Sequence, residues 1–333
     1  MKHILITGAG FIFSNYIDMY ADKYKISVID NFGYASQANR IKELKNVEVY
    51  NCDVSNKKEV YDVFKELYGI DGIIHGAALS HVDNSIESPE PFIYSNIVGT
   101  FNILEAAKDF SIPNVLYIST DETIEHTMPI EYREANGLFP ENRNMDGPTT
   151  LYFSRKRESS SRFKPSSVYS ASKASGEMLA MSYRSTYGMK NLTTVRLCNQ
   201  YGPYQHKEKL IPKTITRALA GEKIPVFETS AYRDWCYITD GCRAIDLLLN
   251  LKKREDLYHI SAYNETQTLD IVKQVLRLMN KDDSLIEMVK DRRGYDLVYS
   301  IDSEKIRSLG WSPEISLEEG LKRTIDHYEK NIS

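Results

Sequence analysis

Two short segments of the chain carry residue types suited to proton transfer from an alcohol. Thr120, Asp121 and Glu122 follow an apolar run, and Tyr169 and Lys173 lie four residues apart at the start of a helical pattern. Residues at this spacing share one helix face, and a nearby ammonium is expected to lower the pKa of the phenol. Two adjacent carboxylates oppose each other's ionisation, so one is expected to stay protonated. The combination predicts oxidation of a carbinol followed by elimination of water from the ketone.

The first half of the chain predicts the element order that would position these groups. Short apolar runs alternate with helical patterns, such as the one across residues 88–110. Strands that are apolar throughout and separated by helices indicate a parallel sheet covered on both faces. We therefore expect a Rossmann-type, doubly wound α/β fold with its ligand crevice at the carboxyl ends of the strands. The expected strands are 3–7, 26–30, 47–51, 72–76 and 115–120.

A glycine turn and two acidic residues indicate a dinucleotide site in that crevice. Gly8 and Gly10 follow the first run and open a helix, where backbone N–H groups and the helix dipole suit a pyrophosphate. Asp30 ends the second run, where a carboxylate accepts from a ribose diol and repels a 2′-phosphate, which favours NAD over NADP. Asp53 follows the third run and is expected to meet the adenine. Phe13 stands where the pattern has its third glycine, so its benzyl group must displace the helix or point elsewhere.

The composition excludes several other classes of function. A length of 333 residues allows an α/β core and a second, smaller lobe, and a net charge of −4 gives no reason to expect nucleic acid binding. No apolar run reaches membrane-spanning length, and the N-terminus lacks a signal-peptide pattern. Four cysteines without metal-ligand spacing predict reduced thiols, no metal site and a cytoplasmic protein. They are Cys52, Cys198, Cys236 and Cys242.

The motifs resemble those of one family along nearly the whole chain. The chain resembles the extended short-chain dehydrogenases/reductases, and among them the nucleotide-sugar 4,6-dehydratases of the dTDP-glucose type. The Asp121–Glu122 pair carries this likeness to dehydratases, since the related sugar 4-epimerases lack it. The matching motifs are AGFIFSN (9–15), HGAALSHVDNSI (75–86), NIVGTFNILEAA (96–107), STDE (119–122), YSASKASGE (169–177), NQYGPYQHKEKLIP (199–212), RDWCYITD (233–240) and DRRGYD (291–296).

The chain also departs from the family pattern. Its glycine loop is one residue shorter, and Leu79 stands where a glutamate is usual. The segment 123–168 is longer than is typical of the family and contains the basic run 155–157. This excursion is interpreted either as a lid or as a surface loop, and both interpretations stay open.

The resemblance implies two domains and a set of binding residues. Residues 1–190 form an NAD-binding Rossmann domain that carries the catalytic residues, and residues 191–333 form a smaller α+β lobe, mainly for the nucleotide sugar, with some segments returning to the first domain. The implied NAD contacts are Gly8, Gly10, Phe11, Ile12, Asp30, Asp53, Val54, Ala77, Tyr169 and Lys173. The implied substrate contacts are Ser80, Asn199, Lys209, Leu210, Phe227, Arg233, Asn264 and Arg292. A homodimer is implied through helices bearing Phe101, Leu104, Met178, Leu179 and Met181.

The resemblance further implies a reaction in three stages. Tyrosinate at position 169 takes the proton of the sugar 4-hydroxyl, to which Thr120 is hydrogen-bonded, while hydride passes from C4 to NAD⁺. Glu122 then removes the C5 proton, protonated Asp121 donates to the departing 6-hydroxyl, and hydride returns to C6. Three alternatives stay open: a nucleotide-sugar 5,6-dehydratase, a 4-epimerase on the same scaffold, and a non-catalytic sensor of NAD or nucleotide sugar. The base and the sugar of the substrate stay open too.

Overall fold

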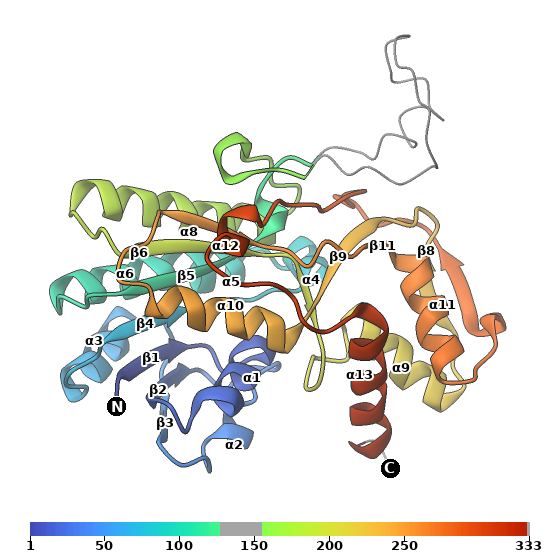
Figure 1. Ribbon diagram of the computed structural model, residues 1–333, viewed down its shortest axis with the longest axis horizontal. Helices are drawn as coiled ribbons and strands as arrows, with labels where there is room; N and C mark the ends of the chain where they lie inside the picture. Colours follow the sequence, from blue (N-terminus) through green and yellow to red (C-terminus); the bar gives the residue numbers. More distant parts are fainter. Residues whose placement is uncertain (127–154, 332–333) are drawn as a thin grey trace, which may run out of the picture.

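A parallel seven-stranded sheet forms the centre of the computed structural model, which describes residues 1–126 and 155–331 (Figure 1). The strand order is β10-β6-β5-β4-β1-β2-β3, so the chain winds outwards in both directions from β1 and β4. This confirms the predicted Rossmann-type, doubly wound sheet. The strands are β1 (His3–Thr7), β2 (Lys25–Asp30), β3 (Val47–Asn51), β4 (Gly72–His75), β5 (Val115–Thr120), β6 (Leu192–Leu197) and β10 (Leu257–Ile260).

The strands alternate their side chains between two hydrophobic cores. Along β1, Ile4 and Ile6 pack into one core, while Leu5 between them packs into the other. Helices α1 (Phe11–Tyr20) and α10 (Ile238–Asn250) cover the first of these faces. Helices α3 (Lys57–Glu66), α6 (Gly99–Asp109) and α8 (Val168–Thr186) cover the second. A sheet buried on both faces explains why its strands are apolar throughout.

The start of α8 is determined by a local capping interaction. The Ser167 hydroxyl accepts from the Ser170 backbone N–H, and the Ser170 hydroxyl accepts from the Ser167 N–H. Such reciprocal caps stabilise the first helical turn, which here contains Tyr169 and is followed one turn later by Lys173. The helical pattern over 88–110 is also confirmed, as α5 (Glu90–Phe92), the π-helical η1 (Ile93–Val98) and α6.

A smaller lobe of helices and two short sheets lies beside the large sheet (Figure 1). One sheet contains β7 (Asn199–Tyr201), β9 (Tyr232–Tyr237) and β11 (Glu265–Gln267), and the other pairs β8 (Ile224–Phe227) with β12 (Ile286–Val289). The helices of this lobe are α9 (Leu210–Ala220), α11 (Thr268–Leu278) and α13 (Leu317–Asn331). Strands β6 and β10 follow residue 190 in the chain and still extend the large sheet. The remaining short helices are α2 (Ala38–Ile41), α4 (Val82–Glu87), η2 (Asp121–Thr123), η3 (Glu158–Ser160), η4 (Asp283–Leu285) and α12 (Glu304–Arg307).

Three observations concern the cysteines, membrane-spanning helices and metal-binding clusters. All four cysteines are buried free thiols. Among residues 1–126 and 155–331, no helix is long and apolar enough to cross a membrane. In the same ranges, no group of three or more His, Cys, Asp or Glu side chains is arranged to hold a metal ion.

Candidate active site

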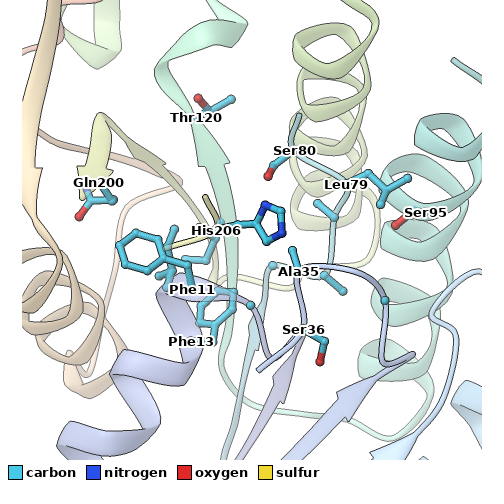
Figure 2. Close-up of a pocket in the computed structure, with 18 of the residues that line it drawn as sticks. Phe11, Phe13, Ala35, Ser36, Leu79, Ser80, Ser95, Thr120, Gln200 and His206 are labelled. Atoms are coloured by element: carbon cyan, nitrogen blue, oxygen red, sulfur yellow. The ribbon is translucent and has the colours of Figure 1, made fainter. Parts of the chain in front are cut away.

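A cavity of about 330 Å³ opens at the carboxyl ends of the central strands (Figure 2). Its wall combines residues from the glycine loop, the ends of β2, β4 and β5, helix α8 and the loop before α9. Most of the predicted site residues therefore meet at one place, as the doubly wound fold requires. Those on the wall are Gly8, Gly10, Phe11, Ile12, Asp30, Val54, Ala77, Ser80, Thr120, Glu122, Tyr169, Lys173, Asn199 and Lys209.

The glycine loop has the geometry of an anion-binding turn. Gly8 has φ +87°, and a Cβ there would lie 2.9 Å from the Ala77 Cα, so only glycine fits without strain. Helix α1 begins after Gly10, and no side chain caps its first turn. The first backbone N–H groups of α1 are therefore available to an anion in the cavity that Gly10 and Phe11 border. Asp30 accepts hydrogen bonds from the N–H groups of Ala9 (2.6 Å) and Phe32 (2.7 Å), which ties this loop to β2. The bare backbone and the adjacent carboxylate fit a dinucleotide.

The Phe13 ring points towards the end of β4. Its side chain is buried in the core and also borders the cavity, next to Phe11 at the start of α1 (Figure 2). A Cβ built on Gly76 would lie only 2.2 Å from the Phe13 Cε2 atom, so the ring occupies the volume that a side chain at position 76 would need. The benzyl group therefore points towards the end of β4, the second of the two expected possibilities.

The two carboxylates after β5 have different surroundings. Glu122 lies on the cavity wall, whereas Asp121 is 2% exposed and lies outside the wall. The Thr120 hydroxyl donates to Asp121 Oδ1 (3.2 Å), and Oδ2 has no hydrogen-bond partner within the described residues. Burial raises the pKa of Asp121 well above its usual range, and the charges of Glu122 and Asp234 add to this shift. Of the two carboxyls, Asp121 is therefore the one whose surroundings more strongly favour the protonated form.

Three predicted substrate residues act electrostatically on Glu122. Burial raises the pKa of Glu122, and the charges of Arg233, Lys209 and Arg292 oppose that rise. Lys209 donates to the Ser80 carbonyl (2.9 Å), and Arg292 pairs with Asp83 (2.7 Å). These cations, distant in sequence, thus form a positive region around the carboxylate that lines the cavity.

The Arg233 guanidinium is enclosed by aromatic and backbone groups. It is 5% exposed, stacks 4.0 Å from the Tyr299 ring centroid and donates to the carbonyls of Tyr232 and Asp296. The Tyr299 hydroxyl lies 3.4 Å from Glu122 Oε2 and donates to Asp296 (2.8 Å). Tyr299 is a site neighbour that the sequence reasoning missed, because no motif surrounds it.

The tyrosine and lysine of α8 are both buried, and one expectation about them is wrong. Burial raises the pKa of Tyr169, and the charge of Glu122 raises it further, although a hydrogen bond with Thr120 acts in the opposite direction. The expected lowering of the Tyr169 pKa is therefore wrong for this structure, because desolvation of the phenolate raises it instead. The Lys173 ammonium donates to the Ile118 carbonyl (2.6 Å), and burial lowers the pKa of Lys173 to about 8 while Glu177 opposes that shift.

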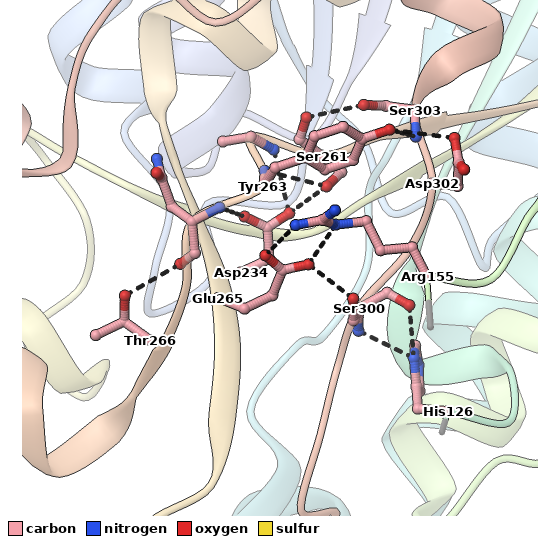
Figure 3. A network of polar contacts seen from close by, with 12 residues as sticks. His126, Arg155, Asp234, Ser261, Tyr263, Glu265, Thr266, Ser300, Asp302 and Ser303 are labelled. Carbon is pink, nitrogen blue, oxygen red and sulfur yellow. Dashed lines mark hydrogen bonds and ion pairs between the residues drawn. The ribbon is translucent and has the colours of Figure 1, made fainter. Parts of the chain in front are cut away.

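A polar network behind the carboxylates joins the two lobes (Figure 3). His126 Nδ1 accepts from the Ser300 N–H (3.1 Å), so its Nε2–H donates to the Asp121 carbonyl (2.8 Å). Arg155 binds Glu265 through two hydrogen bonds (2.6 and 2.7 Å), and the Ser300 hydroxyl donates to the same carboxylate (2.8 Å). The basic run 155–157 therefore contributes an ion pair to the second lobe. Residues 127–154 of the predicted excursion lie outside the described residues.

Besides Asp121, Arg233 and Arg292, four more predicted residues do not lie on the cavity wall, and the roles of all seven stay predictions. The Asp53 carboxylate accepts from the Ser55 N–H and hydroxyl (both 2.8 Å), and Leu210 begins α9 and packs against the core. The Phe227 ring lies 4.8 Å from the Tyr295 ring, and the Asn264 N–H donates to Asp234 (2.9 Å).

Other wall residues were not predicted as site residues. Tyr34 follows β2, and its hydroxyl donates to Glu208 (3.3 Å) while its ring meets the edge of His206 at 5.3 Å. The loop after β2 thus contacts the loop before α9 across the cavity. The sequence did contain a signal for these residues. Tyr34 follows Asp30 closely, and His206 and Glu208 lie within the 199–212 motif.

Comparison with known proteins yields a consistent set of relatives. Residues 4–261 match the model of the NAD dependent epimerase/dehydratase family. The low-salt glycan biosynthesis protein Agl12 of Haloferax volcanii is 36% identical, with 98% of each chain covered. The dTDP-glucose 4,6-dehydratase 1 of Escherichia coli is 34% identical, covering 99% of this chain and 93% of the relative. The crystal structure of DesIV, a dTDP-glucose 4,6-dehydratase from Streptomyces venezuelae with NAD bound, has a TM-score of 0.85 and 33% identity over 99% of this chain and 97% of its own.

Proposed function

The chain belongs to the NAD-dependent epimerase/dehydratase family, and we propose that it converts a nucleoside-diphosphate hexose, of the dTDP-glucose type, into the 4-keto-6-deoxy sugar. The observation that carries this proposal is the asymmetric carboxylate pair. Glu122 borders the cavity under the electrostatic influence of three cations, and burial favours the protonated form of Asp121 beside it. An acid and a base in adjacent positions are what elimination of water requires.

NAD is the cofactor of this enzyme, and the residues around the cavity fit it. The Gly8–Gly10 turn and the start of α1 would bind the pyrophosphate, and Asp30 would bind a ribose diol. When bound, NAD⁺ supplies a hydride acceptor for C4 and returns the hydride to C6, so it is regenerated in each turnover. The protein residues then have to move only protons.

The first proton step belongs to Tyr169. Its phenolate oxygen would take the proton from the sugar 4-hydroxyl, with Thr120 hydrogen-bonded nearby to orient the same oxygen. Because burial raises the pKa of Tyr169, the phenolate would need a cation close to it when substrate is bound, and the Lys173 ammonium one helical turn away is the group that would provide that charge. The product of this step is a 4-ketone, whose C5 hydrogen is acidic.

The elimination would use both carboxylates. Glu122, kept basic by Arg233, Lys209 and Arg292, would remove the C5 proton. Asp121, which lies behind the cavity wall, would donate its proton to the 6-hydroxyl, which leaves as water. Its Oδ2, which has no hydrogen-bond partner among residues 1–126 and 155–331, would carry that proton. The C5 proton held by Glu122 would return to C5 as the hydride reaches C6. One water is lost, and the next turnover requires that the proton gained by Tyr169 be released and that Asp121 take up a proton again.

The same cations support a diphosphate-bearing substrate. A guanidinium offers a charged fork of donors, and Arg233 and Arg292 both act on the region of Glu122. The identity of the nucleotide base and of the sugar is a separate question. The likeness to dTDP-glucose 4,6-dehydratases favours dTDP-glucose, and the likeness to a glycan biosynthesis protein leaves room for another nucleotide sugar.

Mass spectrometry of reaction products tests the proposal. The purified protein with NAD⁺ is incubated separately with dTDP-glucose, UDP-glucose, UDP-N-acetylglucosamine and GDP-mannose. Loss of one water from any of them supports a dehydratase and identifies its substrate, and the position of the new methyl or alkene separates 4,6- from 5,6-dehydration. A change of configuration at C4 without mass loss would indicate an epimerase. Binding without any reaction would favour the sensor.

A further inference from the structure

The ring of Phe13 and the missing side chain of Gly76 are spatially complementary. Phe13 lies in the first turn of α1 and is 4% exposed, between the cavity and the core of the large sheet. A Cβ on Gly76 would lie 2.2 Å from the Phe13 Cε2 and 2.4 Å from its Cζ. Two residues 63 positions apart in the chain thus share the space of one side chain.

The backbone around Gly76 has little freedom to relieve such a contact. The N–H groups of Gly76 and Ala77 both approach the Thr7 hydroxyl, at 3.2 and 3.3 Å. Gly8 on the other side approaches Ala77 so closely that a Cβ would meet its Cα at 2.9 Å. The end of β4 is therefore held against β1 and the glycine loop. A side chain at position 76 must move the Phe13 ring rather than the strand.

The cavity is the direction in which that ring would meet least resistance. Its other surroundings are the close-packed core, which does not accept extra volume without strain. Both Phe13 and Gly76 lie on the wall of the cavity formed by the glycine loop and Asp30. A displaced ring would enter the space that the residues fitted to NAD surround.

We propose that Phe13 and Gly76 act as one unit that shapes the NAD cavity. Gly76 at the end of β4 leaves the space that the Phe13 ring occupies, and NAD affinity depends on the pair rather than on either residue alone. This inference rests on NAD binding and not on the sugar reaction. If the protein binds NAD but dehydrates none of the tested sugars, the Phe13–Gly76 proposal can still be tested by NAD binding.

A double-mutant cycle on NAD binding tests the proposal. Calorimetric titration of NAD⁺ into the full chain is performed for wild type, Gly76→Ala, Phe13→Ala and the double variant Phe13→Ala/Gly76→Ala. Gly76→Ala alone is expected to raise the dissociation constant about tenfold or more, whereas in the Phe13→Ala background the same change is expected to cost about threefold or less. Equal effects of Gly76→Ala in the two backgrounds would overturn the proposal, as would wild-type affinity in Gly76→Ala.

Folding of the variants is measured by circular dichroism and thermal melting, with Gly320→Ala as the matched control. A Cβ on Gly320 would lie 2.2 Å from the Tyr201 hydroxyl, in a tight contact away from the cavity wall. The effect of Gly320→Ala on melting is expected to be the same in the wild-type and the Phe13→Ala backgrounds. If Gly76→Ala fails to fold and the double variant folds, the pairing is supported. If both fail to fold, the Cβ meets something other than the ring, and the proposal is wrong.

Discussion

Glu177 and Arg196 form a buried ion pair whose side chains are 2% and 3% exposed, with the guanidinium 2.6 Å from the carboxylate. The same carboxylate accepts hydrogen bonds from the hydroxyls of Ser119 (2.6 Å) and Thr123 (2.9 Å). These two residues flank Thr120, Asp121 and Glu122 in the chain. A single side chain on α8, one turn after Lys173, therefore holds both ends of the carboxylate segment against the tyrosine helix.

We expect Glu177→Gln to alter catalysis and not only stability. Glu177 raises the pKa of Lys173, so loss of its charge should lower that pKa below about 8. Because the Lys173 cation is needed, the alkaline limb of the kcat profile should move to lower pH, with kcat reduced about tenfold or more. Asp246→Asn is the control, since Asp246 accepts from Tyr16, Lys23 and Tyr24 and lies outside the cavity wall. Asp246→Asn should lower the melting temperature and leave the alkaline limb of the kcat profile unchanged. If that limb does not move in Glu177→Gln, Glu177 does not act on catalysis through Lys173.

Replacement of Tyr169 by Phe should abolish turnover and leave nucleotide-sugar binding nearly unchanged. The change removes only the hydroxyl that exchanges the proton, and general-base catalysis contributes about 10²–10⁴-fold. Product formation by mass spectrometry and sugar affinity by calorimetry are the measurements. Tyr183→Phe on the same helix is the control, because its hydroxyl donates to Glu105 and not into the cavity. Turnover that survives in Tyr169→Phe would show that another group is the base.

The two carboxylates should fail at different stages when they are replaced. Glu122→Gln removes the base, so neither water loss nor deuterium uptake at C5 from D₂O is expected. Asp121→Asn removes only the acid, so C5 should still take up deuterium while water loss slows by about 10²-fold or more. Mass spectrometry of recovered substrate and product separates the two patterns. Deuterium uptake in Glu122→Gln at the wild-type rate would reverse the assignment.

The buried His75 should make the fold sensitive to acid. Its Nδ1 accepts from Thr7 (2.6 Å) and its Nε2–H donates to Thr100 (2.9 Å), and burial, with a contribution from Lys173, lowers the pKa of His75 to about 3. Below pH ~6.5 the unfolded chain binds a proton that the folded chain does not, so stability falls as pH decreases, by about 1.4 kcal/mol per pH unit. Urea unfolding at pH 7 and pH 5 should show a smaller difference for His75→Asn than for wild type. An equal difference in both proteins would exclude this contribution.

Exposed apolar side chains on α8 and η1 support the predicted homodimer, which stays a prediction. Met178 and Met181 are 50% and 54% exposed, and Tyr94 is 54% exposed, whereas Leu104 is fully buried in the chain's own core. Large apolar side chains that stay exposed are typical of an interface between copies. Met178→Glu/Met181→Glu should convert a dimer to a monomer in light scattering. Met288→Glu, at a methionine on β12 that is 46% exposed, should not. A monomeric wild type would refute the prediction.

Local patterns were sufficient for much of the fold and for part of the site. The run 3–7 and β1 coincide, as do 115–120 and β5, since an apolar run bounded by glycine or polar residues marks a buried strand. The carboxyl ends of parallel strands lie at one edge, so the gathering of Gly8, Thr120 and Tyr169 at one cavity also followed.

The sequence by itself determined the sheet, its strand ends and the residues that the family motifs mark, because these depend on spacing along the chain. The tertiary structure alone decided that the Phe13 ring fills the space above Gly76, that Glu122 borders the cavity while Asp121 lies behind it, and that burial raises the pKa of Tyr169. Close approach and desolvation depend on contacts between residues far apart in the chain. No local pattern encodes those contacts.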